Sequence, residues 1–225
     1  PLHGRLAATR AVVHEEDGWL LYAVFSTTAA ETALAREGVV VADESSNGRL
    51  EVKGTGAAEA LRLACGFTDM AVGEGAAQRS VRAYRLAEDI YLVGTLRGGE
   101  AAVLEALAEA GVDCRVRDLT EAWAEIRLIG PASRGVLACV CALDLDPAVF
   151  PDRCVQRGWV LHCEQVIMRR DLGPLPGFSL LGPRSSGVYL WDGLLRVGAR
   201  WGATPIGLES LRELKIVSQI YQEMG

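Results

Sequence analysis

The sequence predicts an α+β protein built from two related lobes, and two segments that share one pattern carry this prediction. Each segment, Arg49–Cys65 and Ala124–Val140, reads as a strand, a turn containing glycine and a helix rich in small residues. Charged and apolar residues alternate before each turn, which is the period of a half-buried strand. Apolar residues then recur at helical spacing. Two copies of one unit in a single chain indicate an internal repeat.

The residues before the first copy predict a helix followed by a buried strand. Thr28 and Glu31 fit a capping box, in which the threonine hydroxyl accepts from the first free N–H groups and the glutamate reaches back to the cap. We expect this helix to place Leu34 inward and to end at Gly38, a residue type favoured just beyond a helix end. Val39–Ala42 then forms an apolar run of the length of a buried strand.

The residues after the first copy complete a ferredoxin-like order. Val81–Leu86 and Ile90–Gly94 read as a hairpin, Glu100–Ala110 as an amphipathic helix and Val112–Val116 as a short strand. Met70–Ser80 contains glycine and alanine without periodicity, so we expect a loop there. Counted from the first copy, the order is strand, helix, strand, strand, helix, strand, which is that of a ferredoxin-like unit.

The second copy is followed by further strands and two helices. Val155–Arg169 alternates as a strand pair, and Phe178–Leu181 adds one more strand. Gly187–Ala199 has apolar residues at helical spacing, and we expect Pro205–Met224 to form a turn, a helix and a final strand. Since no linker or low-complexity segment separates these elements, we expect the two lobes to pack together.

The composition narrows the classes of function and the cellular location. A net charge of −6 over 225 residues, with scattered arginines, argues against a nucleic-acid partner, which needs a clustered positive face. No apolar run reaches the ~18 residues of a membrane span, so we expect no membrane partner. The six cysteines form no C-x-x-C pair, and we expect buried, reduced thiols in a cytoplasmic protein. They are Cys65, Cys114, Cys139, Cys141, Cys154 and Cys163.

The chain offers few candidate catalytic or ligand-binding groups. The three histidines have no partner at metal-ligand spacing, so no metal site is expected, and neither glycine turn has the pattern of a phosphate loop. Asp43 and Glu44 form a carboxylate pair in a turn, where they either cap the backbone or serve a site. Arg169 ends a strand beside a Pro/Gly-rich turn, where it either holds a ligand carboxylate or forms a surface ion pair. Tyr84 is either a core residue or a stacking platform for a ligand.

Several segments, in the same order along the chain, resemble one known family. Asp43–Gly54 is similar, without a gap, to Asp-Val-Ser-His-Met-Gly-x-Ile-x-Val-x-Gly, and Ala124–Leu137 resembles the strand and Gly-Pro turn of the same proteins. Leu190–Leu195 resembles Leu-Trp-x-x-Leu, and Arg169–Ser179 is similar to Arg-x-Gly-Tyr-Thr-Gly-Glu-x-Gly-Phe-Glu. These patterns are those of the aminomethyltransferase family, which contains the T-protein of the glycine cleavage system and its folate-binding relatives.

The resemblance implies two ferredoxin-like lobes of the aminomethyltransferase folate-binding type around a tetrahydrofolate pocket. It implies a first, discontinuous lobe of residues 1–48 with 121–225 and a second, inserted lobe of residues 49–120, without the C-terminal β-domain that is usual in the family. Tetrahydrofolate is the cofactor expected from the resemblance. Arg169 is the expected anchoring cation, with Asp43 and Tyr84 near the pocket.

Two departures from the family pattern imply altered or lost catalysis. The family carries a catalytic Asp on a Gly-Gly-x-x-Asp-Asp hairpin before the strand matched by Val81–Leu86, whereas Gln78, Arg79 and Ser80 stand there in this chain. Leu175 takes the place of the glutamate that grips the pterin ring, and a leucine offers no acceptor for the pterin N–H groups. The catalytic residues are therefore left unassigned.

Two hypotheses of function follow from the resemblance. The first is an aminomethyltransferase-like, tetrahydrofolate-binding protein of one-carbon metabolism, which takes a folate or a small one-carbon donor. If it is an enzyme, we expect a folate-dependent aminomethyl- or methyltransferase. The second is a non-catalytic subunit that resembles the γ subunit of heterotetrameric sarcosine oxidase and acts through a partner enzyme. The second hypothesis predicts a large exposed apolar patch.

Overall fold

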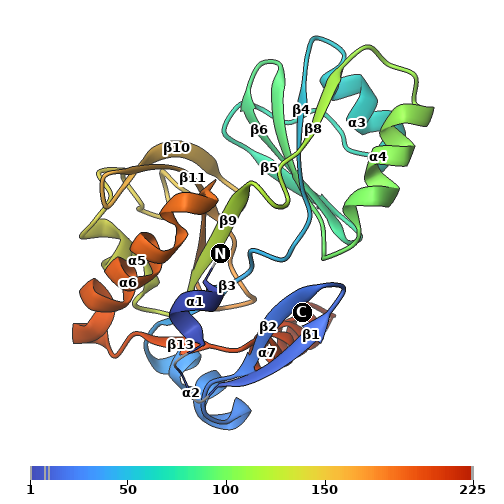
Figure 1. The fold of residues 1–225 in the computed structure, drawn as a ribbon. Helices are drawn as coiled ribbons and strands as arrows, with labels where there is room; N and C mark the ends of the chain where they lie inside the picture. Colours follow the sequence, from blue (N-terminus) through green and yellow to red (C-terminus); the bar gives the residue numbers. More distant parts are fainter. Residues whose placement is uncertain (1, 8, 10, 224–225) are drawn as a thin grey trace.

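The computed structural model describes residues 2–7, 9 and 11–223, which form two sheets with their helices and one separate hairpin (Figure 1). The sheets, of six and five strands, form the cores of two lobes that lie against each other. We term them the six-stranded lobe and the five-stranded lobe. The architecture is α+β, as predicted.

The six-stranded lobe has a mixed sheet covered on both faces. In order across the sheet, its strands are β10 (Val155–Val160), β11 (Cys163–Arg169), β12 (Gly177–Pro183), β9 (Trp123–Ile129), β3 (Val40–Asp43) and β13 (Thr204–Ile206). Only β13 and β3 run parallel. One apolar cluster joins one face to α5 (Ser133–Ala138) and α6 (Gly187–Gly198), and a second joins the other face to α2 (Thr28–Glu37) and α7 (Leu208–Glu223).

The five-stranded lobe confirms the predicted ferredoxin-like order and adds one strand. Its sheet runs β5 (Gly75–Gln78), β6 (Val81–Ala87), β7 (Ile90–Gly94), β4 (Arg49–Lys53) and β8 (Arg115–Asp118). The helices α3 (Ala57–Cys65) and α4 (Glu100–Glu109) cover one face of this sheet. The other face packs through Tyr84 and Leu92 on Val166, Met168 and Leu181 of the six-stranded lobe.

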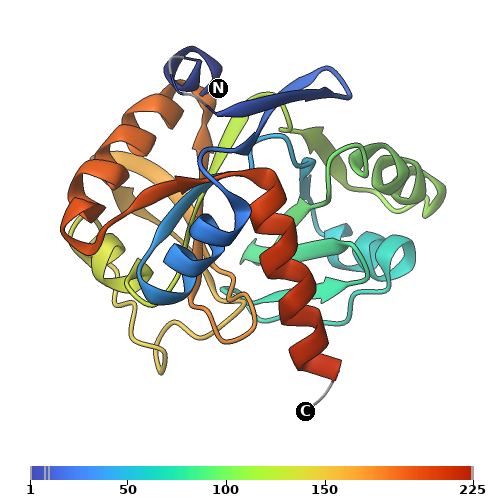
Figure 2. The same cartoon turned by 90° about the horizontal axis from the view of Figure 1, so that it is seen from below.

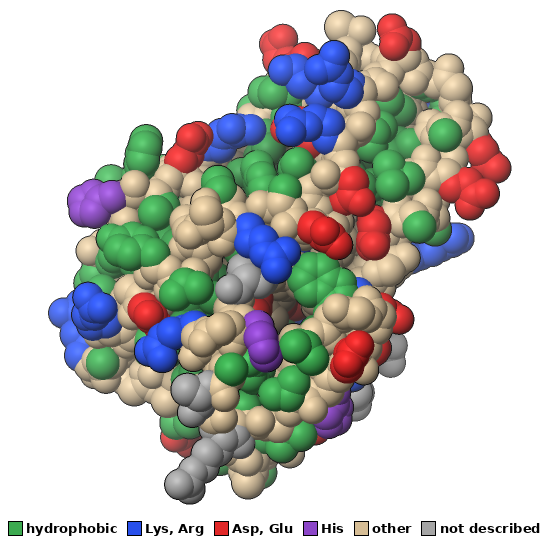
Figure 3. All heavy atoms as spheres, in the orientation of Figure 1, with side chains coloured by type: hydrophobic (Ala, Val, Ile, Leu, Met, Phe, Trp, Pro, Cys, Tyr) green, Lys and Arg blue, Asp and Glu red, His purple; other side chains and the backbone are tan. Residues whose placement is uncertain are grey.

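A hairpin near the N-terminus crosses from one lobe to the other (Figures 1 and 2). After the short helix α1 (His3–Leu6), β1 (Val12–Glu16) and β2 (Trp19–Val24) pair with each other alone. At the tip, Glu16 and Asp17 form ion pairs with Arg97, which precedes α4. Figure 2 shows the hairpin beside α7, with α2 and α7 packed side by side. Figure 3 shows charged side chains of both signs spread over one face of the molecule.

The structure corrects three predictions about local structure in the first 80 residues. The segment expected to be a loop before β6 contains β5, because it pairs with β6 despite its small residues. Thr27, not Thr28, caps α2 by accepting from Ala30 N–H at 3.2 Å. Glu31 does not close a capping box, since its buried carboxylate accepts from the N–H groups of Phe25 and Ser26.

Three more expectations were wrong. Leu34 is exposed on α2. α7 continues to Glu223 where a final strand was expected, and β13 lies in the segment expected to be a turn. Of the cysteines expected to be buried, Cys141 is buried, Cys139 is exposed and the other four are partly buried. All six cysteines are free. Among the residues that the structure describes, no helix has both the length and the apolarity needed to cross a membrane.

Candidate functional site

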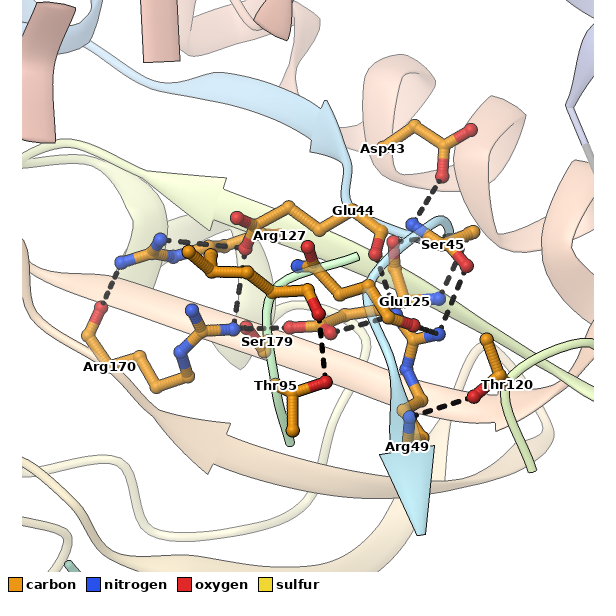
Figure 4. Close-up of polar contacts among 12 residues, drawn as sticks. Asp43, Glu44, Ser45, Arg49, Thr95, Thr120, Glu125, Arg127, Arg170 and Ser179 are labelled. Carbon is orange, nitrogen blue, oxygen red and sulfur yellow. Dashed lines mark hydrogen bonds and ion pairs between the residues drawn. The ribbon is translucent and has the colours of Figure 1, made fainter. Parts of the chain in front are cut away.

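Glu44, in the turn after β3, is one of two buried carboxylates that lie between the lobes (Figure 4). It accepts hydrogen bonds from Lys215 at 2.8 Å, from Arg170 at 3.3 Å and from Arg127 at 3.5 Å. Burial alone would raise the pKa of Glu44, but the charges of these three cations outweigh burial and hold the pKa well below its usual value. Glu44 is therefore ionised, and it joins α7 to the central strands of the six-stranded sheet.

Glu125 on β9 is the second buried carboxylate, and it joins the two lobes. It accepts from Arg170 on one oxygen and, at 2.9 Å, from Arg49 of β4 on the other. Arg170 also donates to the hydroxyl of Ser179 on β12 at 2.9 Å. Burial would raise the pKa of Glu125, yet the charges of Arg170 and Arg49 lower it overall. We term the side chains around Glu44 and Glu125 the central network.

Arg49 fixes the chain where it crosses from one lobe to the other. Its guanidinium donates to the backbone carbonyls of Glu44 at 2.6 Å, Asn47 at 2.8 Å and Ser45 at 3.0 Å. Its backbone N–H donates to the hydroxyl of Thr120, on the segment that returns to the six-stranded lobe. A buried guanidinium with carbonyl partners satisfies backbone groups that would otherwise be costly to bury in a turn.

A cleft of about 470 Å³ opens beside the central network and takes its walls from both lobes; we term it the central cleft. It is lined by Ala76, Ala77, Arg79, Ser80, Arg82, Tyr84, Leu96, Arg127, Asp152, Arg153, Arg170, Asp171, Leu172, Gly173 and Lys215. Six of these side chains are cationic and two are carboxylates. This excess of positive charge in a recessed site attracts anionic ligands.

Both carboxylates that line the central cleft already have partners. Asp171 pairs with Arg169 at 2.9 Å and accepts from Gly177 N–H at 3.0 Å. Asp152 accepts from Asp171 N–H at 2.9 Å and lies 3.8 Å from Arg153. A general acid or base needs a carboxylate that is free to exchange a proton with the reacting group. The described residues of the cleft thus supply no unpaired carboxylate for that role.

The structure brings one of the three site residues expected from the sequence to the central cleft. Tyr84, buried on β6, lines the cleft. Arg169 does not line it; its guanidinium is held by Asp171 and by the carbonyl of Phe150 at 2.8 Å. Asp43 lines a different cavity. Since the three residues do not converge, they do not form one site in this structure.

The cavity that contains Asp43 lies beneath the β1–β2 hairpin and has a volume of about 220 Å³. Apolar and aromatic side chains form most of its wall, among them Leu6, Trp19 and Phe25. Asp43 accepts from Ser45 N–H at 3.0 Å. Burial raises the pKa of Asp43, and the hydrogen bonds from Ser45 oppose this shift only in part. We term this hollow the hairpin cavity.

The residues at the two departures from the family pattern have different surroundings. Arg79 and Ser80 form the β5–β6 turn at the edge of the central cleft, and Arg79 adopts a positive φ of 54°. Leu175 is instead partly buried against the apolar cluster that contains Leu211 and Leu214 of α7. Leu175 therefore contributes to packing. Within the described part of the chain, no group of three or more His, Cys, Asp or Glu side chains could hold a metal ion.

Of the central network, the sequence identified only Glu44 as a candidate site residue. The alternation of Glu125 and Arg127 with apolar residues predicts a half-buried strand, yet both side chains are buried on β9. Arg170 lies directly after Arg169, and no pattern in the sequence distinguishes it. One feature of the sequence does point to these residues. Strands on the two sides of the predicted lobe boundary carry opposite charges, as Arg49 and Glu125 do.

Comparisons with known proteins agree with the fold and the resemblance. Residues 2–221 match the family model described as the GCVT N-terminal domain. The chain is 31% identical over 229 residues to an aminomethyltransferase of Streptomyces avermitilis, covering 96% of this chain and 60% of that protein. It is 28% identical over 209 residues to the sarcosine oxidase subunit alpha of Corynebacterium sp. strain P-1, covering 82% of this chain and 21% of that protein. The chain thus spans only part of these relatives.

Solved structures show the same fold. Aminomethyltransferase T of the glycine cleavage system from Bartonella henselae aligns with a TM-score of 0.82 at 20% identity, covering 96% of this chain and 61% of that one. A chain of heterotetrameric sarcosine oxidase from Corynebacterium sp. U-96 aligns with a TM-score of 0.66 at 23% identity, covering 78% of this chain and 93% of that one. Because the family model covers nearly the whole chain, the protein belongs to the GCVT N-terminal domain family.

Proposed function

We propose that this chain binds a reduced folate in the central cleft, as an aminomethyltransferase-like protein of one-carbon metabolism with altered or lost catalysis. The cationic lining of a cleft between two lobes is the observation that carries the proposal. A folate ends in a glutamate tail with two carboxylates, and arginine binds carboxylates through paired hydrogen bonds. In this proposal residues 1–48 with 121–225 form one lobe, residues 49–120 form the inserted lobe, and the folate lies between them.

The same cleft supports the loss or change of catalysis. Arg79 and Ser80 occupy the turn where the family pattern has acidic residues, and Asp152 and Asp171 are held by other groups. We propose that Tyr84 contacts the ligand from the cleft wall. We propose that Arg169 acts by holding Asp171 and the turn that follows β11. A cytoplasmic location is also proposed, and the six free cysteines support it.

Calorimetric titration with 5-formyltetrahydrofolate, a stable reduced folate, tests the proposal. We expect micromolar binding to the wild type and loss of binding in Ala77→Trp, because a large side chain from the exposed strand β5 would fill the cleft. Ala102→Trp is the matched control, since Ala102 is exposed on α4. Wild-type protein that produces no heat, or equal binding by both tryptophan variants, contradicts the proposal.

A second candidate function is that of a subunit that acts through a partner enzyme. Two observations favour it: the alignment covers nearly all of one chain of a heterotetrameric oxidase, and the hairpin exposes Val12, Val13 and Leu20. Exposed apolar residues on one element are typical of a protein interface. Absence of folate binding, together with copurification of a larger enzyme from native cells, would favour this second function.

A further inference from the structure

Two polar side chains at the inner end of the central cleft have no partner among the described residues. Arg82 and Tyr84 are two residues apart on β6 and therefore lie on the same face of the sheet. Both line the central cleft, and both also line a smaller cavity of about 10 Å³ that continues toward Glu125. No hydrogen bond or ion pair of the described residues involves the Arg82 guanidinium or the Tyr84 hydroxyl.

The charges around Arg82 do not balance without a ligand. The central network contains two carboxylates, Glu44 and Glu125, and both are already shared among other cations. Arg82 adds one more positive charge beside Arg170, whose charge lowers the pKa of Arg82, and burial lowers it further. Glu125 and Glu44 oppose this shift in the pKa of Arg82, but only in part. A half-buried guanidinium beside a like charge, with the nearby carboxylates already shared, is costly unless an anion accompanies it.

We propose that Arg82 and Tyr84 form a carboxylate-binding site at the inner end of the central cleft. The guanidinium supplies a two-pronged donor and the phenol hydroxyl supplies a third hydrogen bond. An α-amino acid fits this site less well than a simple carboxylate, because its ammonium group would find both cleft carboxylates already paired. The inference rests on the proposed use of the cleft, since the folate tail is one of two sources of the carboxylate. The other source is a separate small carboxylic acid.

Binding of three probes to the wild type and to Arg82→Gln tests this proposal. The probes are p-aminobenzoyl-L-glutamate, which is the folate tail alone, acetate, and 6,7-dimethyltetrahydropterin, which has no carboxylate. We expect Arg82→Gln to weaken binding of the carboxylate probes about tenfold or more, as loss of a charge-assisted hydrogen bond does. Arg82→Lys keeps the positive charge but loses the paired N–H donors of the guanidinium. Its affinity for the carboxylate probes should therefore fall between those of the wild type and Arg82→Gln. Tyr84→Phe should weaken binding a few fold.

The matched control is Arg115→Gln, which removes an exposed arginine from β8, the strand at the far edge of the same sheet. We expect it to leave the binding of all three probes within about twofold of the wild type. Binding of the pterin probe should also be unchanged in Arg82→Gln. Tail binding that depends on Arg82 assigns the carboxylate to the folate, whereas acetate binding without tail binding assigns it to a separate acid.

Thermal unfolding separates ligand binding from a structural role of Arg82. Without an anion, Arg82→Gln should unfold at a higher temperature than the wild type, because repulsion from Arg170 is removed. The carboxylate that binds should raise the unfolding temperature of the wild type only. Carboxylate probes that bind both proteins equally, or none that bind the wild type, overturn the proposal. If the pterin and 5-formyltetrahydrofolate fail to bind while acetate binds through Arg82, the folate function fails and this site stands.

Discussion

Two strands, β4 and β9, alternate charged and apolar residues in the same way but place the charged residues in different surroundings. On β9, Glu125 and Arg127 are both buried. On β4, exposure rises along the strand: Arg49 is buried, Glu51 is partly exposed and Lys53 is exposed. Alternation in a sequence therefore shows which side chains share a face of a strand, but not whether water reaches that face.

The difference follows from what covers each strand. β9 lies inside the six-stranded sheet between β12 and β3, and its charged residues face Arg170, Glu44 and the end of β4 (Figure 4). The charged face of β4 is covered only at its Arg49 end, where the lobes meet. Because the charged side chains of β9 are buried, they pair with other charged groups in a network that joins the lobes. This network has more cations than carboxylates, and the excess positive charge faces the central cleft.

The largest expected difference between the two strands is in stability. Glu125→Gln leaves the buried Arg49 without a carboxylate and Arg170 with Glu44 alone, which we expect to cost about 3–5 kcal/mol of unfolding free energy. Glu51→Gln on β4 removes a partly exposed pair with Arg117 and should cost less than about 1 kcal/mol. Urea denaturation of the two variants measures both values. Equal losses would show that the buried charges of β9 are no more important than those of β4.

The stability that the buried carboxylates Glu44 and Glu125 contribute should also depend on pH. The folded-state pKa values of Glu44 and Glu125 lie below the ordinary glutamate value of 4.5, so the folded chain favours their ionised forms. Their contribution is fully present above pH 4.5 and is lost as the pH falls through the lower folded-state values. The stability gap between the wild type and Glu125→Gln should therefore shrink below pH 4.5. Denaturation midpoints from pH 7 to pH 3 measure this gap, and a constant gap would refute the assignment.

The smallest effect concerns two lysines. Lys215 pairs with the buried Glu44, but its side chain is partly exposed, so Lys215→Met should cost only about 1 kcal/mol. Lys53→Met, on the exposed end of β4, should change stability by less than about 0.5 kcal/mol. Thermal unfolding of the two variants compares them. A Lys53 effect that matches or exceeds the Lys215 effect would place the important charges outside the central network.

Much of the fold could be predicted because local patterns determine it. The bounds of β4 and α3 are those expected from alternation, the glycine turn and helical spacing, and the β6–β7 hairpin follows the same logic. β5 could not be predicted, because alanine and glycine carry no strand preference and its pairing with β6 is tertiary. The candidate site was largely missed because burial of Arg170 and Glu125 depends on how the two lobes meet, which no local pattern encodes.

A crystal structure of the chain with 5-formyltetrahydrofolate tests the central claim most directly, because the expected site residues line different cavities. We predict that the ligand lies in the central cleft, between the β5–β6 turn and the Asp171–Gly173 turn, with a carboxylate against Arg82. A ligand bound instead in the hairpin cavity beside Asp43 would contradict the account and make Asp43 the folate-binding residue.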